Sequence, residues 1–235
     1  MSNRILFLIT VAALAMVAGC IVSDQITTLT IREDGSADWV RFQSNIRSTE
    51  PGEKGQDELR RFVEEFDRRE DDELRRLVKA GGEVREARWL RQEEPYANVV
   101  VARLPSAEAL EAFCTIKDEN GEVAARARFS KSAARRRLAI VIPAPRDDQP
   151  RDFGKQATIE ERRRAQASGI SETRIAVAGG RVVDSRGFTV ADDGRSALLE
   201  PDEILGLLAR AEKEVEVFLE WELTEGGAAA RTSRL

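Results

Sequence analysis

Cysteine is the residue with the widest chemistry in this chain, and it occurs twice, at Cys20 and Cys114. As a thiolate, it is both a nucleophile and a metal ligand. Histidine, which is the commonest general base and metal ligand, is absent from the 235 residues. We therefore expect a protein that is not an enzyme, with no catalytic residue, no metal site and no cofactor. What chemistry the chain has should depend on the surroundings of the two thiols.

Cys20 ends an apolar N-terminal segment that follows the basic residue Arg4. The apolar run covers residues 5–17, which is shorter than the ~20 residues that a helix needs to cross a bilayer. A charged start, an apolar middle and small residues before a cut are typical of a secretory signal that is removed after export. A cut after the small residues Ala13 and Ala15 is the alternative to a cut at Cys20.

The tetrapeptide Val17-Ala18-Gly19-Cys20 resembles the lipobox of bacterial lipoproteins. The resemblance implies that residues 1–19 are a signal peptide, and that the Cys20 thiol takes a diacylglyceryl group and becomes the mature N-terminus. Two acyl chains are enough for stable anchoring, because each buried methylene contributes roughly 0.8 kcal/mol. No Asp follows Cys20, which favours the outer membrane, facing the periplasm, in a Gram-negative host. In another host, the outer face of the plasma membrane is expected.

Cys114 is left without a partner once Cys20 carries a lipid, so we expect no disulfide in the mature chain and predict a buried, inert thiol. The acidic pairs at 71–72, 147–148 and 192–193 lack the spacing of a calcium loop. The chain holds 37 basic and 42 acidic residues, with the two signs interspersed. This composition does not indicate a nucleic-acid partner.

The densest basic cluster comprises Lys131, Arg135, Arg136 and Arg137. Side chains alternate along a strand, so at most two of the three consecutive arginines share a face. A solvated strand edge is one interpretation. Contact with anionic lipid headgroups is the other, because each basic residue near such a surface contributes about 1 kcal/mol.

The elements that must position these residues are strands and helices in alternation. The apolar patterns predict strands at 26–31, 37–46, 83–92, 97–104, 123–129, 136–142, 172–177, 181–184, 188–190, 196–199 and 215–223. They predict helices at 56–80, 107–114, 159–167 and from Pro201 onward. We expect an α+β fold, with an antiparallel sheet built from successive β-hairpins and interspersed helices. One such hairpin is predicted around Ala178-Gly179-Gly180.

Two local patterns leave alternatives open. The charged run at 67–73 either forms an exposed turn of one long helix or breaks it into two. Trp39 and Phe42 are three residues apart, so either one of them lies outside the core or a bulge intervenes. Ser106 is predicted to cap the helix that carries Cys114.

Residues 20–25 are predicted to form the lipidated N-terminus and a short tether, residues 26–223 the globular region, and residues 224–235 a disordered tail. The Pro-rich loop at 143–158 either divides the globular region into two subdomains or is a functional loop within it.

The lipobox, the hairpin around Asp34-Gly35-Ser36, the long charged helix, and the strand that leads into residues 104–110 together resemble the LppM-type envelope lipoproteins. The likeness covers roughly residues 26–141. It implies an α+β domain and, as proposed for that family, binding of envelope lipids or glycolipids; it defines no functional residues. The terminal transmembrane helix and basic tail that are common in the family have no counterpart here.

We therefore expect a non-catalytic lipoprotein of the cell envelope, tethered to the membrane through Cys20, that binds an envelope lipid or another apolar ligand. The alternative is a structural or assembly module that binds a protein of an envelope complex. A cavity lined by apolar residues would favour the first hypothesis, and a filled core with an exposed apolar patch would favour the second.

Overall fold

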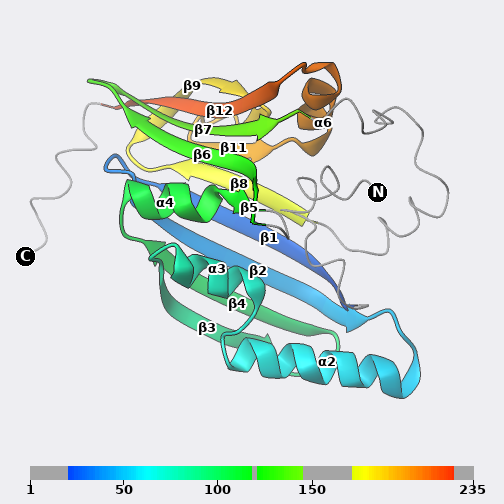
Figure 1. Ribbon diagram of the computed structural model, residues 1–235. Helices are drawn as coiled ribbons and strands as arrows, with labels where there is room; N and C mark the ends of the chain where they lie inside the picture. The colour runs from blue at the N-terminus through cyan, green and yellow to red at the C-terminus, as the bar shows by residue number, and fades with distance from the viewer. Residues whose placement is uncertain (1–20, 118–120, 145–170, 225–235) are drawn as a thin grey trace, which may run out of the picture.

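Alternating apolar residues build two sheets, and the computed structural model describes residues 21–117, 121–144 and 171–224 (Figure 1). The strands of the larger sheet are β1 (Ile21–Ile31), β2 (Ala37–Ser48), β3 (Glu83–Arg91), β4 (Tyr96–Leu104), β8 (Ser171–Val177), β10 (Phe188–Val190) and β11 (Ser196–Leu199). Those of the smaller sheet are β5 (Ile116–Lys117), β6 (Val123–Lys131), β7 (Arg135–Pro143), β9 (Gly180–Arg186) and β12 (Glu214–Leu223). The helices are α2 (Gly52–Asp67), α3 (Asp72–Lys79), α4 (Ala107–Cys114) and α6 (Pro201–Arg210).

The strand order is β10-β11-β8-β1-β2-β4-β3 in the larger sheet and β5-β6-β7-β12-β9 in the smaller one. The predicted α+β class with antiparallel hairpins is confirmed. Two details differ from the expectation. First, there are two sheets, and β1 and β8 run parallel in the larger one. Second, β8 and β9 form no hairpin, because they belong to different sheets.

The segment between β7 and β8 does not separate two units among the described residues. Strands that precede residue 145 and strands that follow residue 170 pair with one another in both sheets: β1 with β8, and β7 with β12. One buried cluster joins residues of both sheets, including Ile31 and Leu104 from the larger and Leu138 and Leu219 from the smaller. The two sheets therefore share a single core.

The first strand begins at Ile21, five positions before its predicted start. Residues 21–25, which were predicted to be a tether, pair with the end of β2 instead. In β2, Trp39 is buried in the core, whereas Phe42 lies on the opposite face and is half-buried. Of the two alternatives, Phe42 outside the core is the correct one.

The charged run at 67–73 breaks the predicted long helix into α2 and α3. Arg69 has a φ of +58°, and the Asp71 side chain accepts a hydrogen bond of 2.9 Å from the Leu74 N–H, which caps α3. The predicted end at residues 81–82 is confirmed, since these two N–H groups bind the Val78 and Leu77 carbonyls.

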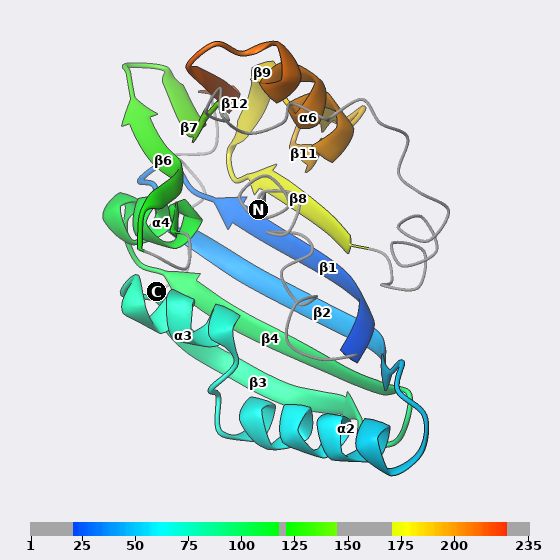
Figure 2. The ribbon, with the colours of Figure 1, turned by 45° about the vertical axis from the view of Figure 1, so that its right-hand side comes forward.

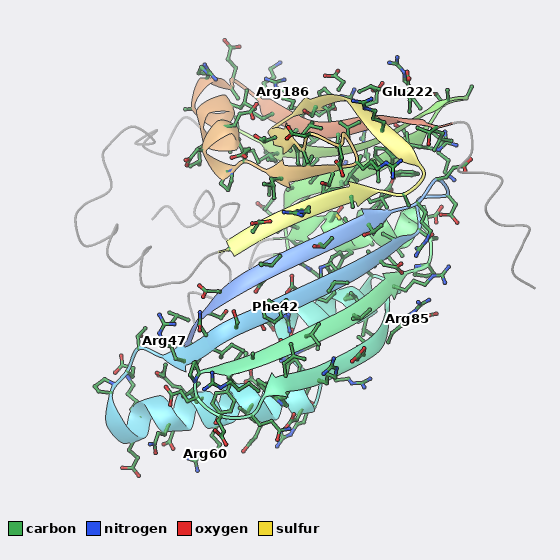
Figure 3. The ribbon with its side chains drawn as sticks, turned by 180° about the vertical axis from the view of Figure 1, so that it is seen from behind. Phe42, Arg47, Arg60, Arg85, Arg186 and Glu222 are labelled. Carbon is green, nitrogen blue, oxygen red and sulfur yellow. The ribbon has the colours of Figure 1, made fainter. Side chains whose placement is uncertain are left out.

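Three of the described helices, α2, α3 and α4, lie on one side of the larger sheet, whereas α6 contacts β12 of the smaller one (Figure 1). Figures 1 and 2 show α2 and α3 in front of β2, β4 and β3, with α4 where the two sheets meet. The Ser106 hydroxyl accepts a 3.3 Å hydrogen bond from the Ala109 N–H, so the predicted cap of α4 is confirmed. From behind, no helix of the described residues lies over the other side of this sheet (Figure 3). None of the described helices has the length and hydropathy to span a bilayer.

Several predictions concern residues outside the described ranges. They are the signal peptide at 1–19, Cys20 itself, most of the Pro-rich loop, the helix at 159–167, the acidic pair at 147–148 and nearly all of the C-terminal tail.

Candidate binding surfaces

The predicted basic cluster is divided between the two faces of β7. The pairing of β7 with β12 places Arg135 opposite Glu222 and Arg137 opposite Glu220 on the outer face. Arg135 makes ion pairs of 2.9 Å to Glu220 and 2.8 Å to Glu222. The hydrogen bonds that Arg135 donates to these carboxylates raise the pKa of its guanidinium. Arg137 pairs with Glu220 at 3.4 Å, and its guanidinium lies 3.7 Å from the Phe218 ring centroid.

Arg136 points the other way and is buried. It donates hydrogen bonds of 2.9 Å to the Glu33 carbonyl and 2.6 Å to the Ser132 carbonyl. Glu33 belongs to the β1–β2 turn, so this side chain ties the larger sheet to the smaller one. All three arginines are bound within the chain. Lys131, the remaining residue of the predicted set, is exposed, and its ammonium lies 5.9 Å from the Phe129 ring centroid.

The same turn contains Gly35, whose φ is +88°. A Cβ at Gly35 would lie 2.6 Å from the Ala107 Cβ and 2.8 Å from the Phe129 ring. Because Ala107 begins α4 and Phe129 belongs to the smaller sheet, the turn is inserted between them. Only glycine fits both the backbone conformation and the space.

The described residues include Cys114 and two of the three acidic pairs, those at 71–72 and 192–193. Cys114 is half-buried and not fully buried as predicted, and its partial burial raises the pKa of the thiol to about 12, against the opposing charge of Arg76. Asp71 caps α3, and Asp193 accepts a 2.8 Å hydrogen bond from the Arg195 N–H in its turn. Among the described residues, no three His, Cys, Asp or Glu side chains are grouped so that they could hold a metal ion.

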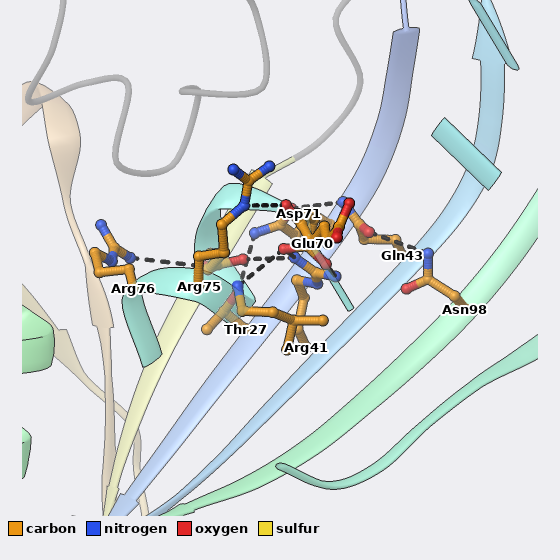
Figure 4. A network of polar contacts seen from close by, with 11 residues as sticks. Thr27, Arg41, Gln43, Glu70, Asp71, Arg75, Arg76 and Asn98 are labelled. Atoms are coloured by element: carbon orange, nitrogen blue, oxygen red, sulfur yellow. Dashed lines mark hydrogen bonds and ion pairs between the residues drawn. The ribbon is translucent and has the colours of Figure 1, made fainter. Parts of the chain in front are cut away.

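A buried polar network, which was not predicted, lies between β2 and α3 (Figure 4). The Arg41 side chain is 4% exposed and makes ion pairs of 3.1 Å to Asp71 and 3.0 Å to Glu73. Burial disfavours its charge, but the two carboxylates outweigh this effect and raise the pKa of Arg41. Strand alternation could have revealed Arg41, because it shares the inward face with Trp39.

The network continues across the sheet through amide side chains. Gln43 donates a 3.0 Å hydrogen bond to Gln25 and accepts one of 3.2 Å from the fully buried Asn98. Gln25 also donates to the Thr27 hydroxyl at 3.2 Å. The network fixes α3 and the register of β1, β2 and β4 and faces the inside of the protein, so we assign it a structural role.

A depression of about 330 Å³ lies beside α6. It is lined by Arg186, Leu207, Arg210, Ala211, Glu214 and Val215. This volume is at the lower limit for small-molecule sites, and three of its six lining side chains are charged. Such a site suits a small polar group better than the acyl chains of a lipid.

The open side of the larger sheet has an apolar centre (Figure 3). The strand register places Ile26, Phe42 and Val99 in one row across β1, β2 and β4. The neighbouring row contains Thr28, Val40 and Val101. Ile26 is 43% exposed, and the other five are half-buried although no helix of the described residues covers them. We call these six residues the open-face patch.

Charged residues end both rows. On β8, Glu172 continues the row of Ile26 and Arg174 the row of Thr28. On β3, Arg88 continues the row of Val99 and Glu86 the row of Val101. Arg174 and Glu172 form an ion pair of 3.1 Å, and Arg88 pairs with Glu86. No local pattern in the sequence predicts this arrangement, because it exists only once five strands are aligned.

No protein family model matches the chain, and no curated protein matches it either. Among solved structures, the fold is similar to that of the folded domain of LppM from Mycobacterium tuberculosis, determined by NMR. The TM-score is 0.41 and the identity 8%, over 90% of this chain and 95% of that domain. The LppM-type lipoproteins are the family that the sequence resembles. The likeness is distant and concerns the fold alone, without the lipobox or lipid attachment.

Proposed function

We propose that this chain is a lipid-anchored protein of the bacterial cell envelope that acts as a protein-binding module and not as an enzyme. The observation that carries the proposal is the open-face patch, which presents five apolar side chains and Thr28 in two rows, on a sheet side that the described helices leave uncovered (Figure 3). Contiguous exposed apolar surface, rimmed by charge, is typical of a protein-interaction site.

The filled core favours a protein partner over a lipid held inside the fold. Trp39, Leu110, Leu138 and Trp221 are at most 1% exposed and pack into one cluster. An acyl chain would need an apolar cavity, and the depression beside α6 is small and charged. Of the two functions expected from the sequence, the assembly or interaction module is therefore the one that the geometry supports better.

The anchor is expected to hold the module directly against the membrane. A lipid on Cys20 would be one residue from the start of β1 at Ile21, and one strand residue spans about 3.3 Å. Outer-membrane placement in a Gram-negative host, facing the periplasm, follows from the absence of Asp after Cys20. The anchor is tested with Cys20→Ser, which should lose incorporation of labelled palmitate and move from the detergent phase to the aqueous phase.

The binding face is tested by comparing Ile26→Glu with Val183→Glu. The two positions are matched, because both carry β-branched strand residues that are 43% and 45% exposed. We expect the full-length protein in gently solubilised envelopes to migrate as a complex on native gels, to become monomeric with Ile26→Glu, and to remain complexed with Val183→Glu. A single monomeric band for all three proteins, or a complex that Ile26→Glu leaves intact, would refute the proposal.

A further inference from the structure

We propose that the partner of the open-face patch is a second copy of this chain, packed face to face so that the strands of the two sheets run in opposite directions. The inference rests on the proposed function of this face as a binding surface. It specifies the partner from the charges that surround the patch.

Those charges form a self-complementary pattern. On β8, the negative Glu172 lies in the row of Ile26 and the positive Arg174 in the row of Thr28. On β3 the signs are reversed: the positive Arg88 lies in the row of Ile26 and the negative Glu86 in the row of Thr28. The four corners of the patch therefore alternate in sign, and the two ion pairs on the face cancel within each strand.

Two copies whose open faces meet can be related by a two-fold axis that lies between the faces and runs perpendicular to the strands. This axis places each strand over the same strand of the other copy and exchanges the two rows. Glu172 of one copy then faces Arg174 of the other, and Glu86 faces Arg88. Ile26 faces Thr28, Phe42 faces Val40, and Val99 faces Val101, so apolar side chains meet apolar or hydroxyl side chains. Isologous contact of this kind is the commonest form of homo-oligomer interface.

An axis that runs along the strands is less favourable. It would also oppose unlike charges at the corners, because it places β8 over β3. It would, however, keep β2 over β2 in the same row. Asp38, which lies one row beyond Val40 and pairs with Arg32, would then face its own copy. With the axis across the strands, Asp38 of one copy lies over Ser44 of the other, and Glu83 of one copy lies over Arg91 of the other. We therefore assign the axis across the strands.

The size of the patch predicts a weak dimer. With its charged corners, the patch covers five strands spaced ~4.8 Å apart and about four residues of ~3.3 Å along each strand, which gives roughly 320 Å² per copy. A standard protein interface buries about 800 Å² per partner, so the free domains should associate weakly in solution. Anchoring in one membrane raises the effective concentration of the two copies without any new contact. The dimer is thus expected on membranes and at high concentration.

The test uses the mature lipidated chain in vesicles of phosphatidylethanolamine and phosphatidylglycerol. Copies labelled at the C-terminus with a donor or an acceptor fluorophore report dimers by energy transfer, and sedimentation velocity of the detergent-solubilised chain gives the mass. We expect transfer for the unmodified chain and for Val183→Glu, with an at least tenfold weaker association for Ile26→Glu.

Two charge variants decide the arrangement. Glu172→Arg makes both β8 corners positive, and Arg174→Glu makes both negative. Each variant alone should associate at least tenfold more weakly, because β8 faces its own copy. A mixture of the two should recover association to within about twofold of the unmodified chain. Both side chains are exposed, so we expect both variants to fold.

Energy transfer that is absent at every surface density, or a mixture that recovers nothing, would overturn the proposal. The failure is distinguishable from failure of the proposed function. If the unmodified chain is monomeric in vesicles but Ile26→Glu still abolishes the complex from native envelopes, the open-face patch binds another protein. If neither experiment responds to Ile26→Glu, both proposals are wrong.

Discussion

Replacing Arg41 by methionine is expected to lower the free energy of unfolding by about 3 kcal/mol. The guanidinium is 4% exposed and holds Asp71 and Glu73 at 3.1 and 3.0 Å. Removing one partner of a buried ion pair costs about 3–5 kcal/mol, because the remaining charge has no compensation. Asp71 and Glu73 are 16% and 21% exposed, so water compensates them in part and the expected loss lies at the lower end.

The assay is urea denaturation of residues 21–235 followed by tryptophan fluorescence. Trp39 is a suitable reporter because its ring centroid lies 5.8 Å from the Arg41 guanidinium. Arg128→Met is the matched control, since Arg128 is an exposed strand residue and should change the stability by less than about 0.5 kcal/mol. The urea slope should stay the same in both variants.

A triple variant separates charge from packing. Arg41→Met combined with Asp71→Asn and Glu73→Gln leaves no uncompensated charge, and Asn is a good helix cap. We expect it to regain at least half of the stability that Arg41→Met alone loses. If Arg41→Met were as stable as Arg128→Met, or the triple variant less stable than the single one, the ion pairs would not be what holds α3 on the sheet.

Three further predictions concern single residues. Arg136→Met should lose about 3 kcal/mol in urea denaturation, because Arg136 bonds the Glu33 carbonyl across the two sheets, whereas Arg135→Met, on the exposed face, should change little. Gly35→Ala should lower the free energy of unfolding by about 3 kcal/mol, because Gly35 has a positive φ and an added Cβ would clash with Ala107. Gly121→Ala is the control, since Gly121 has a similar φ of +78° but open space around it, and it should lose about 1 kcal/mol. Equal losses would contradict the insertion of the turn between α4 and the smaller sheet. The Cys114 thiol should be unreactive towards a disulfide reagent at pH 8 until the chain unfolds. Since its pKa rises from 9.0 to about 12 on folding, its contribution to stability should be lost between those pH values, and Cys114→Ala should not show that loss.

Local patterns in the sequence predicted most of the elements. The alternation along residues 215–223 predicts the strand β12, because a strand buried on one face repeats every two residues. The structure buries Val215, Val217, Leu219 and Trp221 on that face. The caps at Ser106 and residues 81–82 also depend only on near neighbours in the chain. Such features are fixed by interactions over a few residues.

What the sequence did not reveal depends on pairing between distant strands. The carboxylates that engage Arg135 and Arg137 lie on β12, so their role follows only from the β7–β12 register. The alternating charges around the open-face patch require the registers of β8, β1, β2, β4 and β3 together. A strand residue with a half-buried apolar side chain looks the same in the sequence whether a helix covers it or not.

The interleaving of the two sheets has a consequence for how the chain folds as it is synthesised. A chain that emerges from its N-terminus releases β1 and β2 first, but β1 also pairs with β8, and β7 with β12, which follow much later. Until then, one edge of β1 and one edge of β7 expose unpaired N–H and C=O groups, which can pair with other chains. Contacts this distant in sequence also form slowly. The nascent protein therefore needs protection from aggregation until its last strand has emerged.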